Sequence, residues 1–127
     1  MSLSLLSSQR IYKPSHFESL IKKGKFFRGK LLNAWINMKG EVCPRAARPM
    51  IAVMISRKVA QRANKRNLWK RRIKEAFRRN QKEIKRGVAV LIQGRKVNDP
   101  PPYREIEKEL IYFLKKAKAW EKIEGRS

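Results

Sequence analysis

Lysine and arginine side chains crowd one stretch of the chain, residues 57–86, where their charges could bind a polyanion. Fourteen of its 30 positions are Lys or Arg, against Glu75 and Glu83, so its net charge is +12. Four of the cations recur every four residues and would form a ridge on a helix: Arg66, Lys70, Lys74 and Arg78. Like charges at this spacing repel one another, and few glutamates dilute them. The stretch therefore predicts an anionic partner.

The charge of the whole chain indicates which anion this is. Its 127 residues carry a net charge of +23 and its isoelectric point is about 11.1, which is typical of proteins that bind a phosphate backbone. A solvated basic face without a ligand and an anionic membrane surface are the alternatives. A membrane-bound helix would turn its Trp and Phe toward lipid, whereas this small domain needs them for its core. We therefore interpret the chain as an RNA-binding protein.

Side chains that could catalyse a reaction within the protein itself are few. His16 is the only histidine and Asp99 the only aspartate, while Glu105, Glu107 and Glu109 do not share one helix face. Nuclease chemistry with two metal ions needs converging carboxylates. We therefore expect no catalytic residues and no metal site in the protein, and a protein-only nuclease is kept only as an alternative.

Cysteine content and hydropathy indicate a cytoplasmic location. Cys43 is the only cysteine, so neither an intramolecular disulfide nor a zinc site with several cysteines can form, and we interpret it as an incidental thiol. No segment approaches the roughly 20 apolar residues that span a bilayer. The first residues lack the basic and apolar regions of a signal peptide. We expect no membrane partner.

The first helix is predicted from its capping residues. Ser15 and Glu18 have the spacing of a capping box, with Ser15 as the N-cap, and Gly24 can end the helix. Its apolar residues share one side: Phe17, Leu20 and Ile21. A strand follows at residues 30–38, where Leu32, Ala34, Ile36 and Met38 alternate with Leu31, Asn33, Trp35 and Asn37.

The remaining pattern predicts a strand, a long helix, another strand and a last helix. Residues 50–55 and 88–92 are continuous apolar runs, short enough to be buried strands. Between them, residues 64–86 have the apolar spacing of a helix that Gly87 ends, through Trp69, Ile73, Ala76, Phe77, Asn80 and Ile84. After the prolines at 100–102, a second amphipathic helix carries Ile106, Leu110, Phe113, Leu114 and Ala117.

This order of elements predicts an α+β fold in a single RNA-binding domain, residues 1–127. A strand–helix–strand passage over residues 50–92 implies two parallel strands joined by a crossover. We expect the ordered core to run from about residue 9 to residue 118, with frayed termini and a charged tail after Trp120.

Two segments in this framework resemble the signature of the bacterial ribonuclease P protein component. They are Ile55-Ser56-Arg57-Lys58-Val59 and Lys65-Arg66-Asn67-Leu68-Trp69-Lys70-Arg71-Arg72-Ile73-Lys74-Glu75-Ala76-Phe77-Arg78. The resemblance spans residues 9–118 and includes Gly94-Arg95-Lys96. The chain departs from the pattern at Leu68, where the family has the second Arg of Arg-Asn-Arg, at the loop 60–63, which is about one residue longer, and at Ile21, where the family has an aromatic residue.

The resemblance implies a small four-stranded sheet packed with about three helices, similar to the second domain of ribosomal protein S5. It also implies a left-handed βαβ crossover, although right-handed crossovers are the general rule. The family's function is to bind the catalytic RNA of ribonuclease P and to assist Mg²⁺-dependent removal of the 5′ leader from precursor tRNA. The RNA carries out the hydrolysis, so the protein is an enzyme subunit without catalytic residues. No cofactor is expected on the protein alone, and no obligate protein partner.

The resemblance also assigns residues to two RNA surfaces. The catalytic RNA would contact Arg57, Lys58, Arg62, Arg66, Asn67, Lys70, Arg71, Lys74 and Arg78. The leader would lie on Lys13, Phe17, Ile21, Lys23 and Trp35. Aromatic faces beside lysines suit the stacking of unpaired bases, but Phe17 and Trp35 could equally be core residues. A ribosomal or RNA-chaperone-like protein without a role in tRNA processing remains the alternative function.

Overall fold

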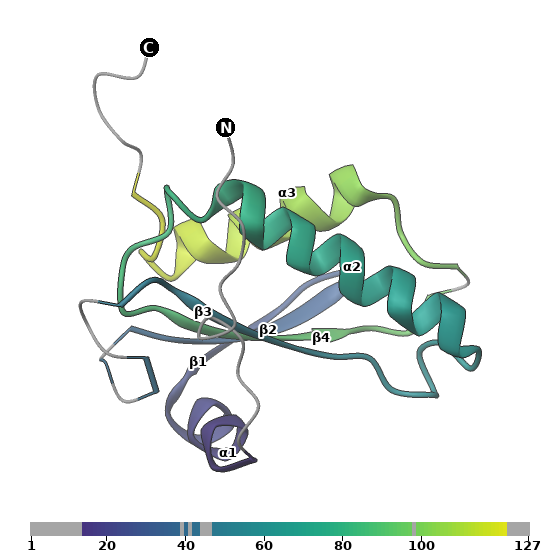
Figure 1. Ribbon diagram of the computed structural model, residues 1–127, viewed down its shortest axis with the longest axis horizontal. Helices are drawn as coiled ribbons and strands as arrows, with labels where there is room; N and C mark the ends of the chain where they lie inside the picture. The colour runs from purple at the N-terminus through teal and green to yellow at the C-terminus, as the bar shows by residue number, and fades with distance from the viewer. Residues whose placement is uncertain (1–13, 39, 41, 44–46, 98, 122–127) are drawn as a thin grey trace.

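The computed structural model describes residues 14–38, 40, 42–43, 47–97 and 99–121, and in them one sheet is combined with three helices (Figure 1). The elements follow in the order α1 (Pro14–Lys23), β1 (Lys25–Arg28), β2 (Leu32–Asn37), β3 (Met50–Met54), α2 (Ala63–Asn80), β4 (Ala89–Gly94) and α3 (Tyr103–Lys116). Residues 9–13 of the predicted ordered core lie outside these residues, as do residues 1–8 and 122–127 of the predicted frayed ends. At the other end the packing extends past residue 118, because Ala119 is buried and Trp120 forms a β-bridge with Ile84.

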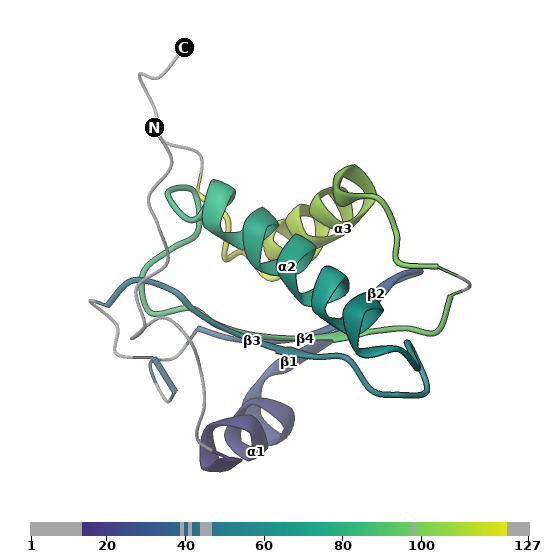
Figure 2. The same cartoon turned by 45° about the vertical axis from the view of Figure 1, so that its right-hand side comes forward.

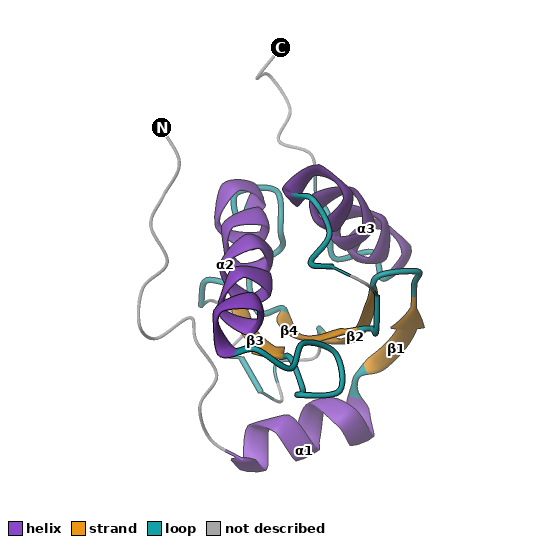
Figure 3. Ribbon diagram, turned by 90° about the vertical axis from the view of Figure 1, so that its right-hand side faces the viewer, coloured by secondary structure: helices purple, strands orange, loops and turns teal. Residues whose placement is uncertain are grey.

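The sheet has the strand order β1-β2-β4-β3, in which β3 and β4 are parallel and the other pairs antiparallel. Helices α2 and α3 cover one face of the sheet and α1 lies on the other (Figure 2). Helix α2 joins β3 to β4, and seen along the strands this crossover is left-handed (Figure 3). The predicted α+β fold, its parallel pair and the hand of its crossover are confirmed.

Each face of the sheet carries its own hydrophobic cluster. Leu32, Ala34 and Ile36 of β2 are buried and pack toward α2 and α3, as their alternation predicts. Trp35, on the opposite face, is partly buried against the cluster between α1 and the sheet. Met38 does not continue the buried row, because β2 ends at Asn37 and the Met38 side chain is 42% exposed.

Helix α2 is shorter than the sequence predicts. It ends at Asn80 rather than at residue 86, and the Asn80 Nδ2 donates hydrogen bonds to the Ala76 carbonyl (2.7 Å) and to Glu107 Oε2 of α3 (2.9 Å). Ile84 is buried, but it lies beyond the helix in a short β-bridge with Trp120. The apolar spacing therefore continued past the end of the helix.

Two further features differ from the sequence expectations. Helix α1 begins at Pro14, a residue whose fixed φ suits the first turn of a helix, so Ser15 lies inside the helix and is not its N-cap. Strand β1 was not found from the sequence pattern, because only four residues, Lys25–Arg28, pair with β2.

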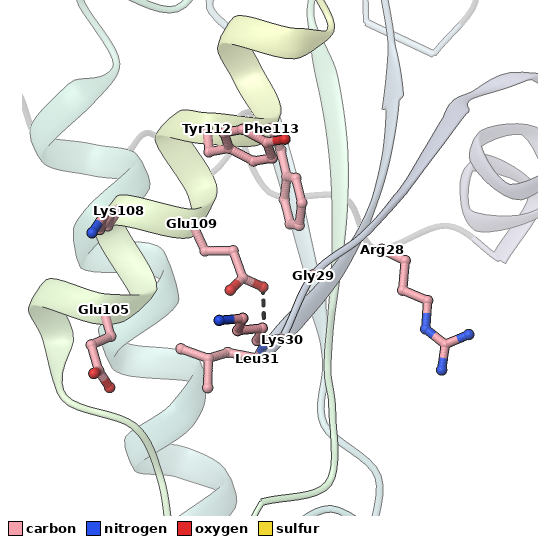
Figure 4. Close-up of a pocket in the computed structure, with 9 residues that line it drawn as sticks. All are labelled: Arg28, Gly29, Lys30, Leu31, Glu105, Lys108, Glu109, Tyr112 and Phe113. Carbon is pink, nitrogen blue, oxygen red and sulfur yellow. Dashed lines mark hydrogen bonds between the residues drawn. The ribbon is translucent and has the colours of Figure 1, made fainter.

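A carboxylate from α3 fixes the turn between β1 and β2. Glu109 Oε1 accepts hydrogen bonds from the backbone N–H groups of Leu31 (3.0 Å) and Leu32 (2.7 Å), as Figure 4 illustrates. The approach is so close that a β-carbon at position 29 would lie 1.9 Å from the same oxygen. Gly29 is therefore needed for this contact between α3 and the edge of the sheet.

We predict that Glu109→Ala lowers the free energy of unfolding by about 2 kcal/mol, because two part-buried donors lose their acceptor. Urea denaturation measures the change. Glu105→Ala is the matched control: it removes the same charge from the same helix, but its exposed side chain forms no hydrogen bond or ion pair with the described residues. Its loss should stay below about 1 kcal/mol, the weight of a charge in a first helical turn. Equal losses would mean that Glu109 acts only through its charge.

Candidate RNA interface

The cations of α2 lie on the side of the helix that faces away from the core. Trp69, Ile73 and Phe77 are at most 1% exposed and pack in the main hydrophobic cluster, so this side of the helix is core, as predicted. Of the predicted RNA-binding residues, the exposed ones are Arg57, Lys58, Arg62, Asn67 and Arg71, and the half-buried ones are Arg66, Lys70, Lys74 and Arg78. A spacing of four residues exceeds one helical turn, so the ridge drifts across the helix surface.

A hollow of about 880 Å³ lies beside the first turn of α2. Four cations line it, Arg57, Lys58, Arg66 and Lys96, together with Val59, Gln61, Ala63 and Val97, and none of these lining residues is acidic. Two predicted RNA-binding residues from the loop before α2 thus meet one from the helix itself, and Lys96 joins them from the segment after β4. The lining of this hollow therefore carries a net charge of +4.

Arg66 is held in a fixed position at this hollow. Its Nη1 donates hydrogen bonds to the carbonyls of Ala60 (3.0 Å) and Gln61 (2.8 Å). The residue before the helix, Arg62, provides no side-chain cap, and the first turn has no acidic residue. The positive end of the helix dipole therefore adds to the cations there, and the hollow suits phosphate oxygens.

Arg78, at the other end of the predicted ridge, is already paired within its own helix. Its guanidinium donates to both carboxylate oxygens of Glu75, at 2.8 Å and 2.5 Å, and Arg79 Nε lies 3.7 Å from the same carboxylate. The Arg78 hydrogen bond holds the pKa of the Glu75 carboxyl below its ordinary value. Glu75 is therefore ionised at neutral pH and offsets part of the charge of this end of the helix.

Aromatic side chains gather on the sheet face that carries α1. Phe26 of β1 lies opposite Trp35 of β2, with ring centroids 4.9 Å apart and planes inclined by 48°. The Phe26 side chain is 49% exposed, whereas Trp35 and Phe17 are half-buried against the cluster of this face. Ile21 on α1 is 48% exposed. Phe17 and Trp35 thus contribute to packing and also remain accessible.

One of the two lysines predicted for this surface belongs to the described residues. Lys23 is exposed at the end of α1, whereas Lys13 lies outside the described residues. Between strands, Asn33 Nδ2 donates to Gln93 Oε1 (3.1 Å), and the buried Asn33 Oδ1 accepts no hydrogen bond from the described residues. Asn33 alternates with Trp35 along β2, so this amide pair lies on the same face as the aromatic rings.

Phe26 is the residue of this face that sequence reasoning missed. Its signal was the Phe26-Phe27 pair just after Gly24, but the two rings face opposite sides of the sheet. Phe26 pairs with Trp35, while Phe27 lies 5.9 Å from the Phe113 ring of α3. Without a strand assigned there, the exposed ring could not be told from a core residue.

The single cysteine and histidine do not form a reactive site in the described residues. The Cys43 Sγ donates to the Arg48 carbonyl (3.2 Å), and burial raises the pKa of its thiol. His16 is half-buried on α1. The part of the chain that the structure describes holds no group of three or more His, Cys, Asp or Glu side chains that could bind a metal ion, and none of its helices is long and apolar enough to cross a membrane.

Comparisons with known proteins agree with this architecture. The family model for ribonuclease P matches residues 5–118. The ribonuclease P protein component of Clostridium botulinum (strain 657 / Type Ba4) is 32% identical over 113 residues, which cover 88% of this chain and 96% of that protein. The chain belongs to the ribonuclease P protein family.

Other members extend the likeness in sequence and in fold. The component of Pseudanabaena sp. (strain PCC 6903) is 27% identical over 90% of this chain and 95% of its own. The RNase P protein of Staphylococcus aureus, solved at 2.0 Å, superimposes with a TM-score of 0.74 at 23% identity and covers 88% of this chain and 97% of its own. That of Thermotoga maritima gives 0.70 at 22%, with 84% and 96% covered.

The chain is therefore the protein subunit of ribonuclease P, a ribonucleoprotein endoribonuclease that matures the 5′ end of tRNA. Membership of this family implies a partnership with the ribonuclease P RNA. The family works as a Mg²⁺-dependent holoenzyme.

One departure of this ribonuclease P protein from the family pattern can now be placed. Leu68, where the family has arginine, is half-buried on α2. Arg72, one turn on, does not replace it, because its Nη1 donates to the carbonyls of Pro100 (3.2 Å) and Pro101 (2.6 Å). Arg71 is exposed and its side chain forms no hydrogen bond or ion pair with the described residues, so it is the cation near Leu68 that remains available.

Proposed function

We propose that the cationic side of α2 and the hollow at its first turn bind the catalytic RNA of ribonuclease P. The observation that carries this proposal is the hollow lined by four cations and no acid. Phosphate contacts there would position the RNA through charge and through the fixed guanidinium of Arg66. The proposed contacts are Arg57, Lys58, Arg62, Arg66, Asn67, Lys70, Arg71, Lys74 and Arg78, joined by Lys96.

The aromatic face beneath the sheet is proposed to bind the single-stranded 5′ leader of precursor tRNA. Exposed rings accept stacked bases regardless of sequence, and Phe26 and Trp35 offer two adjoining rings on one face. Phe17 and Ile21 would line the same path from α1, with Lys23 and Lys13 near the leader's phosphates. The family has a second aromatic residue where this chain has Ile21, and Phe26 would provide the stacking ring that Ile21 lacks.

Hydrolysis is assigned to the RNA subunit with Mg²⁺, and the protein supplies affinity and position. The family processes tRNA in bacteria, so we place this protein in the cytoplasm.

The proposed division of labour is tested with precursor tRNA in Mg²⁺ at modest salt. We expect cleavage at the mature 5′ end when the catalytic RNA is present, and tighter substrate binding when the protein is added to it. We expect no cleavage by the protein alone. Cleavage without the RNA would contradict the assignment of hydrolysis to the RNA subunit, and an RNA subunit unaffected by the protein would contradict the assisting role.

The cationic side of α2 is tested by Lys70→Ala combined with Arg71→Ala. Neither side chain forms a hydrogen bond or ion pair with the described residues, so their removal should spare the fold. Binding of the catalytic RNA should weaken, and the slope of log affinity against log salt should flatten by about 0.7–0.9 per lost phosphate contact. Lys82→Ala with Lys85→Ala, which removes equal charge beyond the opposite end of α2, should leave the slope unchanged. The same flattening in both double variants would indicate only a general charge effect.

The leader-binding face is tested by Phe26→Ala, because this exposed ring can be removed with little loss of packing. Affinity for leader-bearing precursor tRNA should fall about 5- to 100-fold, the weight of one stacked base, while affinity for mature tRNA stays the same. Phe26→Tyr keeps the ring and should bind normally. Equal losses on both RNAs would show that Phe26 has a structural role instead.

A further inference from the structure

A second hollow, of about 580 Å³, lies between α3 and the turn that joins β1 to β2. Figure 4 shows its lining: the turn residues 28–31 on one side and the side chains of α3 on the other. The α3 residues are Glu105, Lys108, Glu109, Tyr112 and Phe113. This hollow lies on the side of the sheet covered by α2 and α3, so it is separate from the aromatic face beneath α1.

Tyr112 gives this hollow an exposed aromatic ring. Its side chain is 54% exposed, the most of the large apolar side chains in the described residues. The ring is backed by Phe113, with centroids 6.1 Å apart, and Phe113 in turn packs against Phe27. Lys116 Nζ lies 5.6 Å from the Tyr112 centroid. A ring fixed in this way is a platform for a planar ligand near a cation.

The charged groups around the platform favour a phosphate-bearing ligand. Arg28, Lys30 and Lys108 line the hollow, and their side chains form no hydrogen bond or ion pair with the described residues. Glu109 lines it too, but its Oε1 already accepts the two backbone hydrogen bonds of the turn. Glu105 is the other acid. Figure 4 shows the Arg28 side chain pointing away from α3, so Lys30 and Lys108, together with Lys116 beside the ring, are the cations that could bind a phosphate here.

The hollow lies at the same end of the sheet as the cationic hollow at α2. Gly94 of β4 lies opposite Leu32 of β2, so β4 ends beside the β1–β2 turn. Directly after β4, the backbone N–H of Arg95 donates to the Leu31 carbonyl (2.8 Å), and its guanidinium donates to the Gly29 carbonyl. The next residue, Lys96, lines the hollow at α2. Arg95 therefore connects the turn that lines one hollow to Lys96, which lines the other, at the end of the sheet that faces the viewer in Figure 3.

We propose that this hollow is a third RNA contact, in which an unpaired nucleotide of the catalytic RNA stacks on Tyr112 while Lys30 and Lys108 bind its flanking phosphates. Stacking on an aromatic ring beside cations is how proteins hold single-stranded RNA without reading its sequence. The inference rests on the proposed function, because the RNA that occupies the α2 hollow is the one that continues across Arg95. Precursor tRNA is the other source of an unpaired nucleotide.

The stacking contact is tested with Tyr112→Ala in the full chain, titrated against the catalytic RNA. Affinity should fall about 5- to 100-fold, whereas Tyr112→Phe, which keeps the ring, should bind as the parent does. Thermal unfolding of both variants checks the fold, and an exposed side chain should leave the midpoint nearly unchanged. Normal binding by Tyr112→Ala overturns the proposal, and so does a loss that Tyr112→Phe shares.

The phosphate contacts are tested with Lys30→Ala combined with Lys108→Ala, against the charge-matched pair Lys82→Ala and Lys85→Ala. The first pair should flatten the salt dependence of catalytic-RNA binding by about 0.7–0.9 per contact, and the second should not. An effect confined to precursor tRNA binding by the assembled holoenzyme would overturn the choice of RNA. If the α2 pair Lys70→Ala and Arg71→Ala weakens binding while these variants do not, the third contact fails and the proposed function stands; if none does, the proposed function itself fails.

Discussion

The burial of one side of α2 is the interaction on which the rest of the molecule depends. Trp69, Ile73 and Phe77 are almost wholly enclosed, and burying a side chain of this size contributes about 1.5–3 kcal/mol. Repulsion between like charges four residues apart costs only a few tenths of a kcal/mol per pair. Packing therefore outweighs the repulsion, and a helix too basic to be stable alone is held with its cations turned outward. The sheet and α3 supply the surface that makes this possible.

Much of the fold could be predicted because the buried positions repeat regularly. All five apolar residues expected on the last helix are buried, and both apolar runs on either side of α2 are strands. Periodicity fails where a residue is buried for another reason: Ile84 keeps the helical spacing but is buried beside Trp120 in a bridge. It also fails in β1, where Phe26 and Phe27 belong to opposite faces and four residues are too few to show alternation.

The candidate site was less predictable, because composition places charges on a surface but does not tell which of them are available. Arg72 and Arg78 have the same sequence signal as Arg71, yet both donate hydrogen bonds to protein acceptors, so Arg78 can offer RNA only the N–H groups that Glu75 does not accept. Arg72 donates to two proline carbonyls, 28 and 29 residues away, and Arg78 donates to a neighbouring glutamate. Likewise, Lys96 joins the α2 hollow only because β4 ends beside the loop that precedes α2. Contacts of this kind depend on tertiary positions that no local pattern contains.

The scarce acidic residues explain why the two hollows stay cationic. The chain has ten Asp and Glu against 33 Lys and Arg, and several of the ten form internal contacts rather than screening the surface. Glu109 fixes the β1–β2 turn. Glu107 of α3 accepts from Asn80 of α2 and, within its own helix, from the Tyr103 hydroxyl. Asp99 binds Lys65 beside the proline segment. These carboxylates stabilise contacts between elements of the fold. They therefore do not neutralise the cations of the α2 hollow, which remain able to bind phosphate.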